Sequence, residues 1–546
     1  GFLIGAVQYL PVLEYVPWSP RAGGKGWEHA VSYSMPIEEL FDVYLPQFSG
    51  ILTKYWGRNG IHHHSEYLGA AALLLAGAAF GAEQRKSFRR FWIGVLIVSV
   101  LWALGGYTPF YHLIYAIVPG TKFFRAPSTM LMVVAFATSV LVGLGSERLL
   151  AGAVSRRYLV GWLVAAGVIA LLASVGAFTS LAQTMASAYP FDVSAVIEAN
   201  RLPVALGGWR SLLFVALAAA LPWLASQGRI DRRALGWGLV AVVALDLWSI
   251  ERQYWMFSPP ASVLYASDPA VEYLKKAETG RVLVLPTTGG GITDRDPYYN
   301  GDALMVHRIR QVLGYHGNEL GNYQRLASRE QVEDYGNRVN PAFWRLANTR
   351  YLYTNGLLND SAFKFLVGPV KNSAGSTVYL YRLPGDNPPA WVVPAFVKAG
   401  DETTRQTVLD PRFDPTRVAI IDSLANLPAA TLTALPAPLA ISAKVTRYDA
   451  GHIALELSAP APAGSALVVS ENYFPGWTVT VDGRPGTTVR TDYTFIGVPL
   501  QAGATKIQLD FHDPAYRRGK TITLIAVLLS LLLAAGGAVA DRRRAA

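Results

Sequence analysis

PGTKFFRAPSTMLMVVAFATSVLVGL, residues 119–144, joins a short loop carrying two cations to a long apolar run. The run from Met130 to Leu144 contains no charged residue, and with its flanks it reaches the length of about 20 residues that a helix needs to cross a membrane. Similar apolar blocks recur along the 546-residue chain, which is 51% hydrophobic and 16% charged. An ordinary soluble protein has roughly 25% charged residues. The sequence therefore predicts a membrane protein.

The composition excludes several classes of site. The chain has no cysteine, which excludes disulfides, thiolate zinc sites and a cysteine nucleophile. Its formal net charge of +10 suits anionic headgroups or phosphates. Because no basic stripe is interleaved with aromatic residues, nucleic acid is not an expected partner.

Eight apolar segments are candidate membrane spans: about 1–16, 67–82, 91–106, 128–149, 158–181, 209–226, 234–250 and 520–540. Cations gather in alternate connections, namely 83–90, 155–158, 228–234 and the tail 541–546. Short cation-rich loops normally face the cytoplasm, so loop 107–127 and the long segment 251–519 are expected outside the cell. The opening GFLIGAVQYLPVLEY looks like the end of a helix, which predicts that the front of the protein is missing.

The predicted domains are a transmembrane domain at 1–250, a mixed α/β region at 251–385, a β-sandwich at 386–519 and a final membrane helix with a cytoplasmic tail at 520–546. Strands are expected at 281–286, 349–355 and 377–384, with a helix in SDPAVEYLKKAE. After residue 386 the pattern alternates between apolar and polar residues. There, hairpin turns are predicted at Asp449-Ala450-Gly451 and at Asp482-Gly483.

The stretch ENYFPGWTVTVDGRP, residues 471–485, resembles the bacterial YfhO family of membrane proteins. The matching pattern is the aromatic-Pro-Gly-Trp turn ending at Trp477, the Val-Asp-Gly hairpin, and the run LQAGATKIQLDF at 500–511 before the final helix. Upstream, YTPFYHLIYAIVPGTKFFRAPSTM, RQVLGYHGNELGNYQRL (310–326) and NTRYLYT (348–354) are also similar to that family.

This resemblance implies a GT-C-like glycosyltransferase that takes a sugar from a polyprenyl-phosphate donor. The sugar would pass to a glycan or teichoic-acid-type acceptor outside the cytoplasmic membrane. The family pattern Arg-x-Pro-x-Arg is incomplete, because Ser128-Thr129 follow Pro127 here. The GT-C catalytic acid lies in the first outer loop, which we expect before Gly1, so no catalytic residue is assigned and the fragment is expected to be inactive.

Lys122 and Arg125 are the predicted ligands of the donor phosphate, since guanidinium and ammonium groups suit phosphate oxygens. The alternative is that they extend to lipid headgroups.

Five further residues are possible members of a substrate groove: Glu14, Asp42, Tyr107, Tyr111 and His112. Each has a structural alternative. Glu14 could pair with Arg21, Asp42 could cap a helix, and the three aromatic residues could belong to an interfacial belt. Trp477 is expected in the core of its turn.

In GIHHHSEY (60–67), His62 and Glu66 could share a helix face, but adjacent histidines diverge and no second ligand cluster follows. No metal and no other cofactor is therefore predicted. Two rival functions remain. One is a membrane-anchored glycan-binding or assembly protein, and the other is a transporter of lipid-linked sugars. Charged residues are almost absent from the middles of the spans, which disfavours the transporter.

Overall fold

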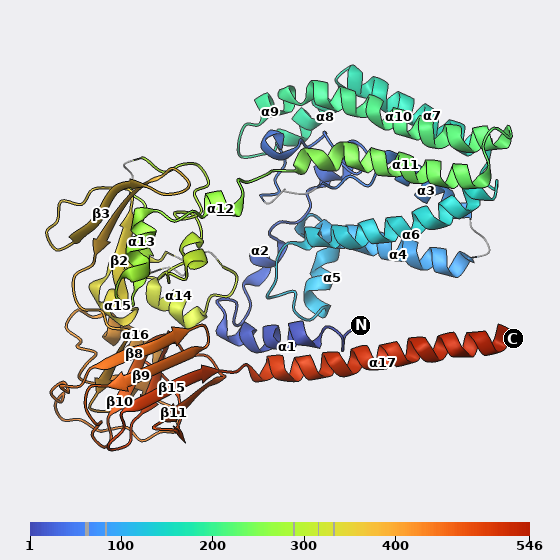
Figure 1. The fold of residues 1–546 in the computed structure, drawn as a ribbon. Helices are drawn as coiled ribbons and strands as arrows, with labels where there is room; N and C mark the ends of the chain where they lie inside the picture. The colour runs from blue at the N-terminus through green and yellow to red at the C-terminus, as the bar shows by residue number, and fades with distance from the viewer. Residues whose placement is uncertain (61–64, 82–84, 288–289, 315, 331–333, 546) are drawn as a thin grey trace. The chain divides into compact units, whose positions relative to one another are not determined.

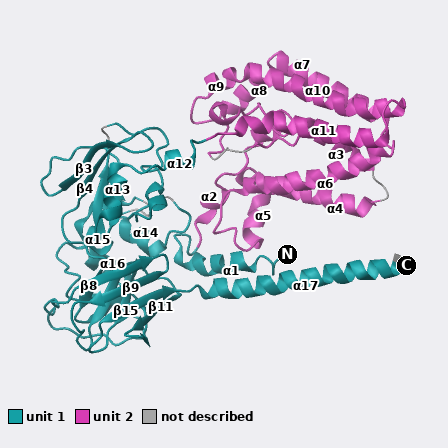
Figure 2. Cartoon of the chain, viewed as in Figure 1, with its two compact units in different colours: residues 1–23, 258–546 teal, residues 24–257 magenta. Residues whose placement is uncertain are grey.

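The computed structural model describes residues 1–60, 65–81, 85–287, 290–314, 316–330 and 334–545 (Figure 1). The chain divides into two compact units: residues 24–257, and residues 1–23 together with 258–546 (Figure 2). The sequence placed a boundary near residue 250, but nothing in it indicated that residues 1–23 group with the region after 258.

Within the described residues, five helices are long and apolar enough to cross a membrane. They are Pro127–Leu150, which contains α6 (Leu131–Leu150), α7 (Arg156–Ser174), α10 (Arg201–Ser226), Arg232–Tyr254, which contains α11 (Arg232–Glu251), and Pro514–Arg544 in α17 (Pro514–Ala545). These helices confirm five of the eight predicted spans, and with them the membrane class of the chain.

The other three predicted spans are occupied by helices that do not meet the same criterion of length and apolar character. α1 (Ala6–Tyr15) has ten residues, and α3 (Ala70–Ala78) extends only to Gly81. α4 (Lys86–Ala103) has 18 residues, but its first turns carry Lys86, Arg89 and Arg90. Its uninterrupted apolar part is therefore shorter than a membrane span.

The predicted span at 158–181 is wrong in its extent. α7 ends at Ser174, and a separate helix α8 (Ala177–Ala186) follows. Gly176 between them has a φ of +82°, a left-handed conformation that ends a helix and that glycine adopts at little cost.

In the unit of residues 24–257, α10 packs on α7 and α11, while α6 packs on α3 and α4 (Figure 1). Leu74, Val215 and Leu239 belong to the buried cluster between these helices. The remaining elements are short: α2 (Gly26–Val31), η2 (Ile37–Phe41), η3 (Leu52–Lys54), η6 (Gly105–Tyr107), α5 (Phe110–Ile117) and α9 (Ser194–Ala199).

In the other unit, a four-stranded sheet has the order β1-β2-β4-β3. Its strands are β1 (Arg281–Val284), β2 (Thr349–Thr354), β3 (Lys364–Lys371) and β4 (Thr377–Arg382), with β1 parallel to β2 and the other pairs antiparallel. The short helices α12 (Ala261–Leu264), α13 (Pro269–Lys276), α14 (Gly321–Ala327) and α15 (Pro341–Leu346) accompany it. The three predicted strands and helix α13 are present, and β3 was not predicted.

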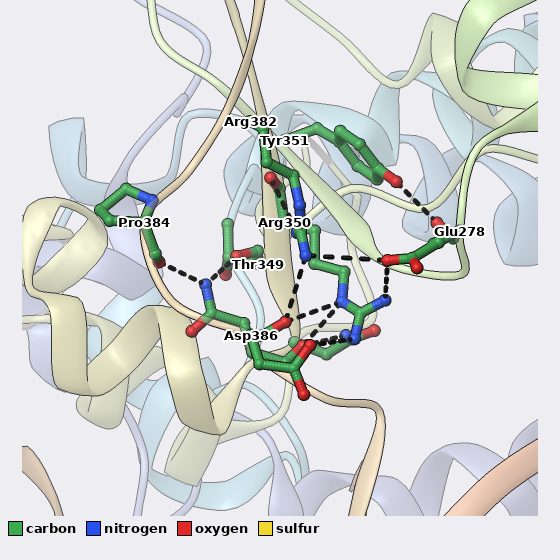
Figure 3. Close-up of polar contacts among 9 residues, drawn as sticks. Glu278, Thr349, Arg350, Tyr351, Arg382, Pro384 and Asp386 are labelled. Atoms are coloured by element: carbon green, nitrogen blue, oxygen red, sulfur yellow. Dashed lines mark hydrogen bonds and ion pairs between the residues drawn. The ribbon is translucent and has the colours of Figure 1, made fainter. Parts of the chain in front are cut away.

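A buried arginine ties this sheet to the segment that follows it (Figure 3). Arg350 of β2 is 7% exposed, and its guanidinium pairs with Glu278 at 2.9 Å and with Asp386 at 3.0 Å. Its Nε–H donates to the backbone oxygen of Asp386 at 2.9 Å, and the Tyr351 hydroxyl donates to the backbone oxygen of Glu278 at 2.9 Å. Because the charge is paired on two sides, the buried guanidinium fixes the end of α13 and the approach to the next domain.

Residues 390–511 form two sheets that share a hydrophobic cluster containing Val469, Ile496, Ile453 and Leu509. The first sheet has the order β5-β10-β14-β13-β7-β6 and the second β12-β11-β15-β9-β8. Their strands are β5 (Ala390–Val393), β6 (Phe396–Ala399), β7 (Ala419–Asp422), β8 (Ala443–Asp449), β9 (His452–Leu457), β10 (Ala466–Asn472), β11 (Trp477–Val481), β12 (Arg484–Pro485), β13 (Val489–Thr491), β14 (Phe495–Pro499) and β15 (Lys506–Phe511).

Both predicted hairpins are present in the second sheet. β8 pairs with β9 across residues 450–451, and β11 pairs with β12 across Asp482-Gly483, where both residues have positive φ. The first sheet differs from the antiparallel pattern that the alternation indicated, because β6 and β7 are parallel and the helix α16 (Asp401–Leu409) connects them. Trp477 is partly buried and packs against the cluster that the sheets share, as predicted for its turn.

Helix α1 lies along the first part of α17 (Figure 1). The backbone N–H of Val7 donates to the Thr523 hydroxyl at 3.0 Å, and that hydroxyl donates to the backbone oxygen of Ile4 at 3.0 Å. The first residues of the chain are thus held by its last helix.

A fully buried carboxyl joins β7 to the turn between β13 and β14. Asp492 is 0% exposed and has a φ of +45°. Its Oδ1 accepts the N–H of Ile420 at 2.8 Å, and its own N–H donates to the Ile420 oxygen at 2.8 Å. Burial raises the pKa of Asp492 to about 7, although the Ile420 hydrogen bond opposes this effect.

We predict that Asp492→Asn reduces the pH dependence of stability. Between the unfolded pKa near 4 and the folded value near 7, the folded protein retains a proton that the unfolded chain releases. The free energy of unfolding of the wild-type protein should therefore fall as pH rises through this window, by an amount of order 4 kcal/mol for this one group. Asparagine keeps the Oδ1 acceptor, tolerates positive φ and does not ionise.

The measurement uses the absence of native cysteine. The buried substitution Val468→Cys is introduced with and without Asp492→Asn in the full chain in detergent, and the rate of thiol labelling is followed from pH 5 to 8. The rate should rise with pH more steeply when Asp492 is present. Equal slopes in the two backgrounds would contradict the prediction.

Candidate functional site

Two loop segments of the unit 24–257 are hydrogen-bonded into one structure, which we call the loop assembly (residues 25–60 and 103–127). Four bonds from backbone N–H groups join them: Met35 N–H to the Ala103 oxygen at 2.8 Å, Gly106 N–H to Ser34 Oγ at 3.0 Å, Ala126 N–H to the Ser32 oxygen at 2.9 Å, and Lys25 N–H to the Lys122 oxygen at 3.1 Å. These bonds therefore hold the loop that carries Lys122 and Arg125 against residues 25–35.

Lys122 and Arg125 are both exposed and both lie beside aromatic rings. The Lys122 ammonium is 5.8 Å from the ring centroid of Tyr115, and the Arg125 guanidinium is 4.9 Å from that of Tyr33. Among the described residues, neither cation forms an ion pair with a carboxylate. Their positive charges are therefore available to an external anion.

Trp27 of α2 gathers the aromatic residues of the second loop. His112 stacks on it with ring centroids 4.0 Å apart, and Tyr111 and Tyr115 approach it to 5.9 and 5.4 Å. Tyr111 is buried, with its hydroxyl 3.4 Å from the Ala30 oxygen, whereas His112 is exposed. The structure thus brings Tyr111, His112 and, through Tyr115, Lys122 to one aromatic group.

The centre of the loop assembly is a bidentate ion pair. Arg58 donates from Nε and Nη2 to the two oxygens of Glu38 at 3.1 and 3.0 Å, and Glu38 is 1% exposed. The Tyr189 hydroxyl also donates to Glu38. Both carboxylate oxygens are therefore occupied, which makes Glu38 a residue that positions Arg58 and Tyr189.

Two tyrosine rings enclose the guanidinium of this pair. Arg58 lies 4.6 Å from the ring centroid of Tyr107 and 5.1 Å from that of Tyr189. Tyr107 is half-buried and contacts Arg58, whereas Tyr111 and His112 pack against Trp27. Tyr33 lies between Arg125 and the chain near Arg58. The Arg125 guanidinium lies over its ring, and its Cε1 would lie 3.5 Å from a side-chain carbon at Gly60.

Two more buried carboxylates follow Glu38. Glu39, 0% exposed, accepts the Tyr55 hydroxyl at 2.5 Å, and that hydroxyl accepts the Asn59 N–H at 2.8 Å. Burial raises the pKa of Tyr55, and the Glu39 charge raises it further, so this phenol stays protonated at physiological pH. It therefore acts as a hydrogen-bond donor.

Asp42 is 2% exposed and closes the loop that ends at Ser49. Its oxygens accept the Ser49 N–H at 3.0 Å and the Ser49 hydroxyl. Burial raises the pKa of Asp42 well above its usual range, and the Glu66 carboxylate adds to this effect, while the bonds from Ser49 oppose it. The Asp42 side chain therefore closes the loop 42–49 and does not cap the next helix, η3, and its membership of a substrate groove stays a prediction.

Glu14 belongs to the other unit, on α1. It is half-buried, and its Oε2 atom is buried without a hydrogen bond. Among the described residues it forms no ion pair with Arg21. The pairing that the sequence offered as its alternative is therefore absent in that part of the chain.

No group of three or more histidine, aspartate or glutamate side chains in the described residues could hold a metal ion. His62 of the GIHHHSEY stretch lies outside the described residues, and Glu66 is described and buried.

Two features of this unit escaped the sequence analysis. Glu38 and Arg58 are 20 residues apart in loops without periodicity, and the only signal was an adjacent acidic pair within an apolar stretch. The second feature is a charged pair within two spans. Arg210 of α10 is 3.7 Å from Asp246 of α11, which is 0% exposed. Asp246 also accepts the Tyr67 hydroxyl at 2.5 Å and the Ala71 N–H at 3.0 Å, so it caps the start of α3.

Part of the chain matches a known protein family. The family described as "Bacterial membrane protein YfhO" matches residues 422–523, from the end of β7 to the first turns of α17. This region includes the Tyr473–Trp477 turn and the Asp482-Gly483 hairpin, while the loop assembly lies outside it. No curated protein and no solved structure matches the chain. The chain thus combines candidate membrane spans with a C-terminal region, residues 422–523, that matches the YfhO family of bacterial membrane proteins.

Proposed function

We propose that this protein is a glycosyltransferase of the cytoplasmic membrane that takes a sugar from a polyprenyl-phosphate donor. The acceptor would be an extracytoplasmic glycan or teichoic-acid-type polymer. The observation that carries the proposal is the pair of exposed cations, Lys122 and Arg125, that have no carboxylate partner among the described residues and are set against aromatic rings. The GT-C-like assignment rests on the family resemblance.

The reaction assigns a task to these cations. An acceptor oxygen bonds to the anomeric carbon of the sugar, the bond from that carbon to the phosphate oxygen breaks, and the acceptor proton leaves to a base. Negative charge then develops on the phosphate, and Arg125 and Lys122 would stabilise it through charge-assisted hydrogen bonds. The Glu38–Arg58 pair would position Tyr107 and Tyr189, whose rings could contact a sugar.

A glycan-binding protein without transferase activity is the second candidate. A cleft lined by residues of the other unit favours it. The Arg210–Asp246 pair is a charged pair within two spans, a feature expected of a transporter. It supports that function only weakly, because Asp246 already accepts hydrogen bonds from Tyr67 and from the start of α3.

We predict that the two ends of α10 face opposite sides of the membrane, with the Ser187 side outside. Ser187→Cys and Ser226→Cys are matched single-cysteine variants, since both serines are exposed and the chain has no cysteine. In intact cells, a membrane-impermeant maleimide should label the first and should label the second only after the membrane is permeabilised. The reverse pattern would place Lys122 and Arg125 in the cytoplasm and contradict the proposed donor site.

We also predict that Arg125→Gln lowers sugar transfer by about 100-fold, and that adding Lys122→Gln lowers it further, because each removes a donor aimed at the developing charge. Arg125→Lys should fall between, since lysine keeps the charge and loses the planar fork. The assay measures the polyprenyl phosphate released from polyprenyl-phosphate-glucose and from polyprenyl-phosphate-N-acetylglucosamine in liposomes, by the protein expressed from its complete coding sequence.

Arg157→Gln is the matched control, because Arg157 is an exposed cation elsewhere in the same unit, at the start of α7. Binding of sugar-free polyprenyl phosphate is measured in parallel, so that the test of the two cations does not require the correct sugar. If Arg125→Gln and Arg157→Gln bind this lipid as well as the wild type does, the phosphate site is excluded.

A further inference from the structure

A cleft of about 640 Å³ is lined only by residues of the unit formed by residues 1–23 and 258–546, and no residue of the loop assembly belongs to its lining. Its walls come from the segment after α1, from α14 and from the β10–β11 and β13–β14 connections of the β-rich region. A volume of this size falls within the range of roughly 300–1,000 Å³ that is typical of small-molecule sites.

The segment that forms one wall is firmly attached to this unit. The Tyr15 hydroxyl donates to the backbone oxygen of Glu319 at 2.5 Å, and within the segment the Ser19 hydroxyl donates to the backbone oxygen of Val16 at 2.8 Å. At Gly321 of α14 a side-chain carbon would lie 3.0 Å from the Ser19 oxygen, a tight contact that glycine avoids. The cleft is therefore a built feature of the unit.

Aromatic side chains form its apolar side. Trp18 lies 6.0 Å from Tyr473 and 5.6 Å from Phe474, measured between ring centroids, and the rings are tilted by 53° and 59°. Trp18 and Tyr473 line the cleft and are half-buried. The Tyr473 hydroxyl has no hydrogen-bond partner within the described residues. It can therefore bond to a ligand while its ring packs against one.

Polar groups with unused hydrogen-bonding capacity form the other side. Gln324 is 3% exposed, and its amide nitrogen donates to Glu319 at 2.7 Å, but its carbonyl oxygen is buried without a partner. Asn322 makes one weak bond, 3.4 Å from its nitrogen to the Tyr493 oxygen. A buried acceptor without a donor is unfavourable, and a ligand hydroxyl would satisfy it.

The charge of the cleft is small. Arg490 is paired with Asp401 at 2.7 Å and with Asp422 at 2.6 Å, so its charge is compensated. Arg325 is exposed at the rim and has no ion pair among the residues that the structure describes. The lining thus combines aromatic faces, amide and hydroxyl groups, and one uncompensated cation.

This combination matches the chemistry of a saccharide. Sugar rings present apolar C–H faces that pack on aromatic rings, and their hydroxyls need both donors and acceptors at close range. An acyl chain would leave the buried Gln324 oxygen without a donor. We infer that this cleft is a binding site for an uncharged oligosaccharide, with Trp18 and Tyr473 as the stacking surface and Gln324 as a buried hydroxyl acceptor.

The inference does not depend on sugar transfer. The test titrates the full chain in detergent, without donor lipid, with maltotriose, chitotriose and glycerol phosphate. At least one of the two oligosaccharides should bind in a saturable way. Trp18→Ala should weaken that binding by about tenfold or more, and Trp18→Phe should restore most of it. Tyr273→Ala, which removes an exposed aromatic side chain elsewhere in the same unit, should leave binding unchanged.

A second measurement does not require the removal of a large side chain. Ala22→Cys places a thiol on an exposed residue of the cleft, and a bound oligosaccharide should slow its maleimide labelling several-fold while leaving that of Ser187→Cys unchanged. Three results would overturn the inference. They are absence of oligosaccharide binding, binding of glycerol phosphate alone, and equal oligosaccharide affinities of the wild type and Trp18→Ala without protection of the thiol. Oligosaccharide binding that persists in the Lys122→Gln/Arg125→Gln variant would separate this site from the proposed transfer site.

Discussion

The bidentate pair between Glu38 and Arg58 is the constraint on which the loop assembly depends. A buried carboxylate is strongly unfavourable unless a cation and hydrogen bonds compensate it, and Glu38 receives three such bonds. The same guanidinium is enclosed by the rings of Tyr107 and Tyr189. Four chain segments must therefore meet at one point, and the loop that ends at Arg125 is positioned as a consequence, through its bonds to residues 25–35.

Three arginines of the unit 24–257, Arg58, Arg210 and Arg125, differ in their surroundings in a way that indicates different roles. Arg58 and Arg210 face carboxylates within 4 Å, and their partners are buried, so removal of either cation would leave an uncompensated charge in the interior. Arg125 is exposed beside Tyr33 and forms no ion pair among the described residues. A cation placed against an aromatic ring at the surface contributes little to stability, so Arg125 can be replaced in the proposed test with little effect on the fold.

The sequence predicted those features that depend on local patterns. The apolar runs predicted five spans, and Asp482-Gly483 predicted a hairpin, because a tight turn requires positive φ at both central residues. It failed where a distant contact decides the outcome. The break at Gly176 lies within an apolar run, and strand β3 contains the Gly368-Pro369 dipeptide, which disfavours a strand. The Glu38–Arg58 pair forms only when the chain folds, so the adjacent acidic residues Glu38 and Glu39 could mark one partner but nothing local could indicate the other.

The two proposed sites lie in different units of one chain, and this separation has a physical consequence. A saccharide held in the cleft beside Trp18 would be tethered to the unit that carries Arg125, at an effective concentration set by the connections between the units. Millimolar effective concentrations are common for short links, so even weak binding in the cleft would supply an acceptor efficiently. A transferase that acts on a long polymer benefits from such an arrangement, because the cleft can hold one stretch of the polymer while another stretch reacts. The cleft then needs only modest affinity, which agrees with walls made of aromatic rings and amides and with a single uncompensated cation.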